Sequence, residues 1–444
     1  MYCQIRMKCR RSASRILSIL LLLLSISPAA FANHYDVQDI GSFGGATNPV
    51  DINASGQVVG QSQDGAGIYR VFIYENGTLT DIGSSISASS SFASAINDLG
   101  QVIGSAYLPP NNFNRFYLYD GSSVTNLNDL PGFPVTTSAG NALTGLNNLG
   151  QMIAVRGSSS KEALLLSPNG SGNYDQVIIG YPDKNNWAFG LNEVGQIAGM
   201  SRYDDPAYNA AFLYDNGALS DIGTLGGTFS SAADINENGQ IAGQSSTGTQ
   251  NHAYLYTDGS MLDLGTLGGT SSTALGLDDL GRVVGYGYTA DYKKHAFIYS
   301  DGAMQDLNDL IPTGTGWVLE EARGINNNGQ IFGVGKLNGQ SRAFFLAPAN
   351  HAPIANAGND FSDFERNTVT IDGSASSDAD GSITSFQWVQ TSGKAVTLSG
   401  ADSAIATFRV PNVKTATAYS FQLTVVDDDG ASAVDSVVVT ISPK

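Results

Sequence analysis

The chain has 444 residues and carries 40 acidic against 22 basic side chains, a formal net charge of −18. This acidic balance, with no basic stripe, argues against nucleic acid and anionic membrane surfaces as partners, because phosphate groups must be neutralised by cations. The only two cysteines are Cys3 and Cys9. No disulfide, thiol nucleophile or cysteine-based metal site is therefore expected beyond the first few residues.

Residues 1–32 are predicted to be a secretory signal peptide. Basic residues from Arg6 to Arg15 precede an apolar stretch from Ile16 to about Ile26, and Ala30-x-Ala32 fits the small-residue cleavage rule. The apolar stretch is shorter than the roughly 20 residues that span a bilayer, which favours cleavage over an uncleaved anchor. Cleavage would remove five basic and no acidic residues, giving a net charge of −23. We expect a periplasmic or extracellular protein with no transmembrane segment in the mature chain.

A short phrase, Asn/Asp-x-x-Gly-Gln/Arg, recurs seven times after this segment. Its glycines are spaced 42 to 50 residues apart and are Gly56, Gly100, Gly150, Gly195, Gly239, Gly281 and Gly329. The Asn or Asp side chain can cap its own backbone, and glycine supplies the positive φ of a tight turn. Self-similarity at this period indicates a repeat architecture such as a propeller or a solenoid.

Each repeat reads as four short strands. Apolar runs precede and follow the phrase, and a third run such as Ala253–Tyr256 leads into an Asn-Gly or Asp-Gly dipeptide before a fourth run such as Met261–Leu264. The dipeptides, which predict two-residue hairpin turns, are Asn76-Gly77, Asp120-Gly121, Asn169-Gly170, Asn216-Gly217, Asp258-Gly259 and Asp301-Gly302. A four-stranded antiparallel meander of about this length is typical of a propeller blade. No helix is expected.

The two ends of the repeat array complement each other. The last repeat ends after its third strand, Arg342–Leu346, whereas an unpaired fourth strand, Tyr35–Gly41, precedes the first repeat and resembles Leu219–Gly223. The N-terminal strand can therefore complete the last repeat. We predict a closed seven-bladed β-propeller over residues 33–348; the alternative, an open β-solenoid, would instead need capped ends.

The repeats resemble the HAF family of extracellular repeats. The tripeptide of that name occurs as His295-Ala296-Phe297, with a near match at His252-Ala253-Tyr254, and the phrase Asp263–Thr270 is also typical. The resemblance covers about residues 35–347; it implies secretion and no established activity, and it transfers no catalytic residues. The third repeat departs most, since Ala163–Leu166 lacks aromatic residues and Ala154 replaces a glycine.

Residues 349–353 read as a linker, and residues 354–444 as a second domain. Six or seven short alternating strands in about 90 residues predict an immunoglobulin-like β-sandwich. The segment resembles a PKD domain in the phrases Ala355–Gly358, Asp372–Gly381, Phe386–Trp388 and Leu423–Gly430, although Trp388–Gly393 replaces the acidic form Trp-Asp-Phe-Gly-Asp-Gly. The resemblance implies a spacer or a module that contacts glycans or proteins.

One metal site is predicted, in the second domain. Asp378 and Asp380 stand two residues apart before a glycine, with Asp372 and Asp427 as companions. Calcium prefers oxygen ligands on such a turn. The alternative is that these residues only form turns, because a calcium loop normally has more alternating acids. No other cofactor is expected.

Catalytic residues are not evident. His252 and His295 occupy the same repeat position, at the entry to the third strand, and neither accompanies a serine–base or ligand cluster, so we expect them to pack at the strand edge. Glu320 and Glu321 lie near Trp317 and could serve glycoside hydrolysis. Neighbours in a strand point to opposite faces, however, and a second well-placed acid is lacking.

The predicted binding residues are aromatic and lie in or beside the loops between second and third strands. These loops vary in sequence, whereas the turns at the other face are uniform, and the residues are Tyr107, Phe113, Tyr203, Tyr208, Tyr286, Tyr288 and Tyr292. Tyrosine suits sugar rings and protein surfaces. The alternative is that these rings shield blade edges.

We therefore predict a secreted, non-catalytic binding or scaffold protein that contacts a glycan or an extracellular protein through the variable face. A glycan-active enzyme and a purely structural surface or matrix component are the alternatives. The sequence does not specify the ligand or the oligomeric state.

Overall fold

The computed structural model describes residues 35–444 except 87, 109–112, 137, 139, 203–207 and 379–380. The predicted signal peptide lies outside the described residues, as do Tyr203 and Asp380. Two 3₁₀ turns, η1 (Leu127–Asp129) and η2 (Leu307–Asp309), accompany the strands. None of the described segments forms a helix of the length and apolarity that crossing a membrane requires. The chain is all-β, as predicted.

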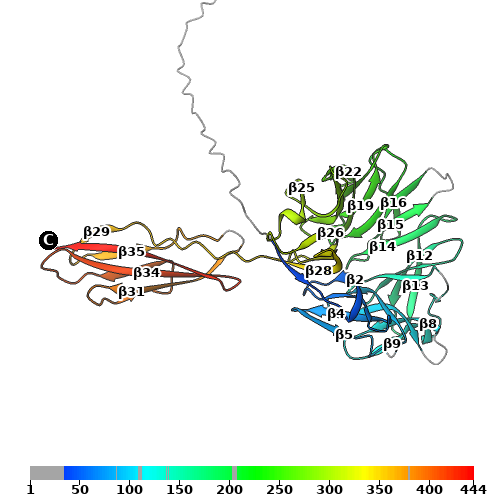
Figure 1. Cartoon of the computed structure of the whole chain (residues 1–444), viewed down its shortest axis with the longest axis horizontal. Helices are drawn as coiled ribbons and strands as arrows, with labels where there is room; N and C mark the ends of the chain where they lie inside the picture. Colours follow the sequence, from blue (N-terminus) through cyan, green and yellow to red (C-terminus); the bar gives the residue numbers. More distant parts are fainter. Residues whose placement is uncertain are drawn as a thin grey trace, which may run out of the picture. The chain divides into compact units, whose positions relative to one another are not determined.

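Seven four-stranded antiparallel sheets occupy the described part of residues 35–348 (Figure 1). Sheets 1 to 4 are β2 (Gly44–Ile52), β3 (Val58–Asp64), β4 (Tyr69–Glu75) and β5 (Thr78–Asp81); β6 (Ser91–Ile96), β7 (Val102–Leu108), β8 (Phe113–Tyr119) and β9 (Val124–Asn126); β10 (Ala142–Leu146), β11 (Met152–Arg156), β12 (Glu162–Pro168) and β13 (Tyr174–Ile179); and β14 (Asn185–Leu191), β15 (Ile197–Arg202), β16 (Asn209–Asp215) and β17 (Ala218–Asp221). Sheets 5 to 7 are β18 (Ser230–Ile235), β19 (Ile241–Ser246), β20 (Asn251–Thr257) and β21 (Ser260–Asp263); β22 (Gly268–Leu277), β23 (Val283–Thr289), β24 (Lys294–Ser300) and β25 (Ala303–Asp306); and β26 (Trp317–Ile325), β27 (Ile331–Leu337), β28 (Gln340–Pro348) and β1 (Tyr35–Asp39).

Sheet 7 joins the two ends of the repeat array. β1 pairs antiparallel with β28, with Tyr35 opposite Pro348 and Asp39 opposite Phe344. The prediction that the N-terminal strand completes the last repeat is confirmed. The last three strands of the repeat array, β26 to β28, therefore form a four-stranded sheet only together with β1, which comes from the start of the array.

The repeated Asn side chain caps the backbone of its own turn, as predicted, and also bonds to the turn of the next sheet. In sheet 3, Asn147 Oδ1 accepts the backbone N–H of Gln151 at 2.9 Å, and Gly150 has φ 73°. The amide of the same side chain donates to the carbonyl oxygen of Asn192, in sheet 4, at 3.1 Å. A buried carbonyl of one turn is thus satisfied by the side chain of the preceding turn.

The inter-sheet bond recurs from turn to turn. The donor–acceptor pairs are Asn53 to Asn97, Asn97 to Asn147, Asn192 to Asn236, Asn236 to Asp278 and Asn326 to Asn53. Asp278 has no amide, and Arg282 donates instead to the carbonyl oxygen of Asn327 at 3.1 Å. The turns are therefore linked in a circuit that returns to its first member. The first strand of each sheet also contacts that of the next, and β26 contacts β2.

The hydrophobic core is divided in the same way. Each of seven buried clusters is shared by two consecutive sheets, including one that joins Phe332 of sheet 7 to Phe72 of sheet 1. A four-stranded sheet buries only part of its apolar surface alone, so stacking against both neighbours completes its burial.

The third repeat has Ala154 where the other repeats have glycine, and Gly243 shows what the glycine avoids. In sheet 5, a Cβ on Gly243 would lie 2.1 Å from the carbonyl oxygen of Ser231 and 2.9 Å from the ring of Tyr254, the residue opposite it. In sheet 3 the equivalent pair is Ala154 opposite Leu164. The smaller leucine relieves the contact with the ring but not the closer contact with the backbone carbonyl, so the two departures from the repeat compensate each other in part.

The Asx-Gly dipeptides form the predicted two-residue turn in four of six repeats. Asn76, Asn216, Asp258 and Asp301 all have φ near 50°, and the glycine that follows each also has positive φ, as a type I′ turn requires. The prediction is wrong at Asn169-Gly170, where a longer loop places the positive φ at Gly172 and the backbone N–H of Asn169 bonds to the carbonyl oxygen of Asn173. At Asp120-Gly121 the predicted hairpin forms, but its turn starts one residue later: the N–H of Asp120 bonds to the carbonyl of Ser123, and Gly121 has φ 92°.

The C-terminal region forms the predicted β-sandwich. Its strands are β29 (Phe361–Phe364), β30 (Thr368–Asp372), β31 (Ile383–Ser392), β32 (Leu398–Ser399), β33 (Ile405–Arg409), β34 (Thr417–Asp427) and β35 (Ser432–Ser442). They make two sheets, ordered β29-β35-β34-β31 and β30-β33-β32. A single buried cluster that includes Trp388, Phe408 and Phe421 joins the sheets.

Candidate functional site

The first strands of sheets 1 to 7 carry a shared irregularity that shapes the interior. Each has a β-bulge at the same place, as between Ala232 and Asp234 in β18. The bulge residues are Val50, Ser94, Thr144, Phe189, Ala233, Leu275 and Arg323, and all seven line one cavity of about 320 Å³, here called the central cavity. Bulges re-aim side chains and commonly lie beside functional sites.

A second cavity of about 490 Å³, here called the mouth cavity, adjoins the first. The two share Phe189, Ala233, Leu275 and Arg323, but the mouth cavity extends toward earlier residues of the first strands, such as Glu321. In an antiparallel meander, the starts of first strands lie at the same end as the loops between second and third strands. The mouth cavity therefore lies on the side of the variable loops.

Glu321 and Arg323 are the charged residues that line the mouth cavity. Glu321 pairs with Arg323, whose Nε lies 2.7 Å from the carboxylate, and with Lys294. Burial raises the pKa of Glu321, but the hydrogen bonds from Lys294 and Arg323 outweigh it, so the pKa lies below its ordinary value. Arg323 also donates to Asn48 Oδ1 at 2.6 Å and to the carbonyl of Pro49. Both cations are thus held in place by more than one contact.

Tyr286 is the predicted binding residue that lies nearest this network. Its ring centroid is 3.9 Å from Lys294 Nζ and 6.4 Å from the ring of Tyr288, which stands edge-on to it. Tyr292 belongs to the same hairpin but occupies its turn, with 75% of its surface exposed and φ 63°.

The other predicted aromatic residues belong to different sheets. Tyr107 in sheet 2 is partly exposed and stands edge-on to Phe92, with ring centroids 6.5 Å apart. Tyr208, before sheet 4's third strand, donates its hydroxyl to Asp221 at 3.0 Å; burial and then that carboxylate raise its pKa. Phe113 begins β8. The predicted set is thus distributed over three sheets rather than gathered into one cluster.

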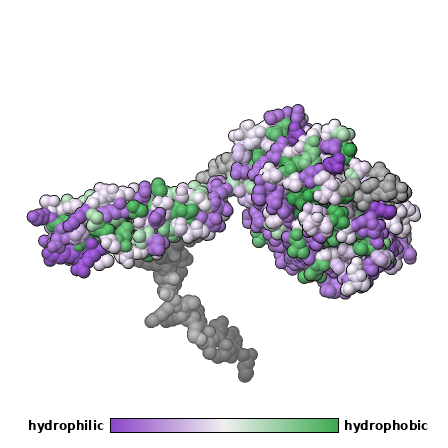
Figure 2. All heavy atoms as spheres, turned by 90° about the horizontal axis from the view of Figure 1, so that it is seen from below, coloured by the Kyte–Doolittle hydropathy of each residue, from purple (hydrophilic) through white to green (hydrophobic). Residues whose placement is uncertain are grey.

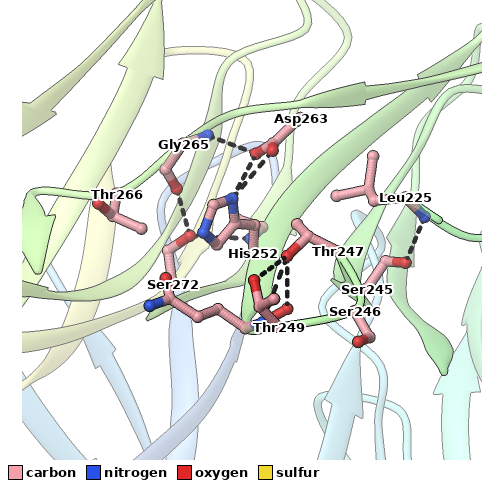
Figure 3. Close-up of polar contacts among 12 residues, drawn as sticks. Leu225, Ser245, Ser246, Thr247, Thr249, His252, Asp263, Gly265, Thr266 and Ser272 are labelled. Atoms are coloured by element: carbon pink, nitrogen blue, oxygen red, sulfur yellow. Dashed lines mark hydrogen bonds and ion pairs between the residues drawn. The ribbon is translucent and has the colours of Figure 1, made fainter. Parts of the chain in front are cut away.

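The two repeat histidines each contact an acidic residue of their own sheet. His252 Nδ1 lies 2.9 Å from Asp263 (Figure 3). His295 Nδ1 lies 2.5 Å from Asp306. Ser272 lies beside the first pair, but its hydroxyl accepts the N–H of Ala253 and donates to the carbonyl of Gly265. Since the serine proton is already engaged, these residues tie strands together and do not form a nucleophilic triad.

Glu320 and Glu321 have separate partners. Glu320 pairs with Lys336 at 2.6 Å and does not line the mouth cavity, whereas Glu321 does. Two carboxylates that flank one glycosidic bond would need to face the same space.

Two acidic residues of the central cavity were missed by the sequence analysis. Asp51 and Asp234 follow the bulges of β2 and β18, and burial raises their pKa values to about 7 and about 6. Each accepts two backbone N–H groups, one of them from the next sheet, and these bonds partly offset the effect of burial. The sequence did contain a sign of these two residues, because the other repeats have alanine or glycine at the position that follows the bulge.

The predicted calcium ligands are only partly described. Asp372 accepts the N–H of Ser374, and Asp427 Oδ1 accepts that of Ala431. Asp427 Oδ2 and both carboxylate oxygens of Asp378 are buried without a hydrogen-bond partner, and Asp380 lies outside the described residues. Among the residues that the structure describes, no group of three histidine, cysteine or acidic side chains is arranged to hold a metal ion.

Comparison with known proteins assigns the C-terminal region. Residues 357–441 match the family model of the K319L-like PKD domain. No curated protein matches the chain.

Solved structures show partial likeness. The PKD domain of the KIAA 1837 protein is 31% identical over 22% of this chain and 94% of its own, with a TM-score of 0.19. A nucleoside hydrolase-related hypothetical protein from Saccharophagus degradans is 24% identical over 21% of this chain and 26% of its own (TM-score 0.20). TolB from Acinetobacter baumannii is 12% identical over 93% of this chain and 83% of its own (TM-score 0.34). These TM-scores assign no fold or function to the whole chain.

Proposed function

We propose that the chain is an exported, non-catalytic binding protein in which sheets 1 to 7, built from HAF repeats, are the blades of a closed seven-bladed β-propeller. The circuit of turn-to-turn hydrogen bonds supports closure, as do the seven clusters shared by consecutive sheets and the pairing of β1 with β28. An open solenoid would leave two unshared end faces.

The binding site is the variable side of this ring, and its ligand is a glycan or an extracellular protein. The observation that carries the proposal is the mouth cavity, which lies on that side and combines aromatic, amide and charged side chains. Sites for small ligands are concave and place a few polar groups among apolar walls. The PKD domain would act as a spacer or an auxiliary contact.

An enzyme on this scaffold receives less support. Glu321 is engaged by two cations, and Glu320 faces a different partner. A general acid for glycoside hydrolysis needs a raised pKa, and that of Glu321 is lowered.

The test is a glycan array probed with residues 33–444, with and without calcium. We expect selective binding that is lost in Tyr286→Ala and retained in Leu149→Ala, which changes an exposed side chain in a uniform turn at the other end of the strands. If no glycan binds with or without calcium, a glycan ligand is excluded, and a protein partner or a structural role is left. Export is tested separately: the mature protein should begin at Asn33, and a chain that retains residues 1–32 would contradict it.

A calcium site in the PKD domain is a second proposal. Three buried, unpartnered carboxylate oxygens on Asp378 and Asp427 support it. Such oxygens are costly in a folded protein unless a cation or an ordered water binds them.

A further inference from the structure

We infer that the mouth cavity binds the carboxylate-bearing end of an acidic sugar chain, a uronic acid residue. This inference rests on the proposed function and narrows its ligand. The sugar ring would lie against the aromatic wall, and its carboxylate would face Arg323, with Lys294 adding positive charge through its pair with Glu321.

Charge is the first argument. The chain as a whole is strongly acidic, yet Arg323 lines this cavity beside Glu321, and a second cation, Lys294, pairs with the same carboxylate. Lys294 and Arg323 share a single Glu321, which leaves one positive charge without a matching anion among these three groups. Asp51 and Asp234 line the adjoining central cavity, where burial raises the pKa of each and backbone N–H groups already occupy their carboxylates. A neutral sugar would not balance that charge, whereas a carboxylate would do so in partly desolvated surroundings.

The arrangement of Arg323 is the second argument. Its Nε is engaged by Glu321 and its Nη1 by Asn48 and Pro49, so the guanidinium plane is fixed. Its Nη2 donates no hydrogen bond to any residue that the structure describes. A fixed guanidinium with a remaining donor suits a planar carboxylate, because little side-chain entropy is lost on binding.

The cavity walls are the third argument. Phe189 and Phe229 supply apolar rings, while Gln244 and Thr273 form a hydrogen-bonded pair at 2.8 Å that can rearrange toward ligand hydroxyls. A volume of about 490 Å³ lies within the usual ~300–1,000 Å³ of small-ligand sites. A surface with apolar faces and dispersed hydroxyl partners fits a sugar ring better than an extended peptide.

The face shown in Figure 2 carries no broad apolar patch among the described residues. On the face shown in Figure 2, hydrophobic residues form small separate groups among hydrophilic ones. Large exposed apolar patches mark protein interfaces, and small scattered ones do not.

The experiment is calorimetric titration of residues 33–444 with a uronic acid tetrasaccharide and with the same tetrasaccharide after carboxyl reduction. We expect the uronate to bind at least tenfold more tightly, and this difference to shrink as salt rises. In Lys294→Gln and Arg323→Gln the difference should disappear, whereas Lys336→Gln, which removes a cation from the same sheet outside the cavity, should keep it. Melting curves check that each variant is folded.

The outcomes separate this inference from the proposed function. Equal binding of the two tetrasaccharides overturns the inference, and the array result for neutral glycans then decides the function alone. Loss of uronate preference in Lys336→Gln as much as in Arg323→Gln also overturns it, since the effect would be one of net charge. A short peptide whose C-terminal carboxylate displaces the uronate at equal concentration would replace the sugar as the ligand.

Discussion

Residues 35–348 and the PKD domain bury their apolar side chains in different ways. In the first region each of seven small clusters belongs to two sheets, and polar side chains link consecutive turns. In the PKD domain one cluster joins two sheets. A defect in the repeats should therefore be felt at a sheet boundary, whereas a defect in the sandwich core should affect that whole domain and leave the repeats unchanged.

The largest effect is expected for Trp388→Ala. The side chain is 2% exposed in the single core of the sandwich, and truncating a buried aromatic side chain costs about 3–5 kcal/mol. Denaturant unfolding of the full chain should show the sandwich transition at lower denaturant and the repeat transition unmoved. Val389→Ala, at the exposed neighbouring position, is the control. A joint shift of both transitions would refute the independence of the two regions.

Asn147→Ala should destabilise the repeats by about 2–3 kcal/mol. The substitution leaves the Asn192 carbonyl and the turn's own N–H groups without partners, and each buried unpaired group costs about 1–3 kcal/mol. Hydrogen exchange should increase at both the sheet 3 and the sheet 4 turns. Leu149→Ala, an exposed position in the same turn, should have almost no effect. If hydrogen exchange increases only in the turn of sheet 3, the inter-sheet hydrogen bond contributes little to the stability of sheet 4.

Gly243→Ala should cost about 1–3 kcal/mol, because the new methyl group collides with the Ser231 carbonyl and the Tyr254 ring. Adding Tyr254→Leu should recover part of the loss, since it recreates the Ala154–Leu164 pair of sheet 3. The thermal midpoints of the single and double variants measure the coupling. Strict additivity of the two changes would contradict the proposed compensation.

Lowering the pH from 7 to 5 should stabilise the repeats relative to the sandwich. The pKa values of Asp51 and Asp234 in the folded chain, about 7 and about 6, lie above the ordinary value of 3.8. The folded state therefore binds protons that the unfolded state releases, and stability rises as pH falls through this window. The gain is at most about 1.4 kcal/mol per pH unit for each group. Urea unfolding at several pH values measures this gain, and the double variant Asp51→Ala/Asp234→Ala, which should lack it, is the control. If the repeats instead become less stable from pH 7 to 5, the raised pKa values of Asp51 and Asp234 are contradicted.

Calcium should give the smallest shift and only in the sandwich. At ten times its Kd, a ligand that binds only the folded state stabilises it by about 1.4 kcal/mol. Asp378→Asn should abolish the shift and Asp402→Asn should keep it. An unchanged sandwich melting temperature in millimolar calcium would leave Asp378 and Asp427 as turn residues.

The sequence by itself determined the local structure of the repeats and their number. Glycine at a positive φ and an Asx residue that caps its own backbone are local requirements, so Asn147 and Gly150 could be read correctly without tertiary information. The complementary ends predicted the pairing of β1 with β28, since a strand without a partner in its own repeat needs one elsewhere. The longer loop at Asn169 was missed because the dipeptide alone does not fix loop length.

Only the tertiary structure decided what the repeats build together. The Asn147 amide reaches Asn192 because two turns 45 residues apart lie side by side. Lys294, Glu321 and Arg323 come from β24 and β26, and nothing in either strand alone marks them as one site. Cavities and buried charges depend on which sheets stack and where the bulges aim their side chains. These are long-range relations, whereas turn chemistry is settled within four residues.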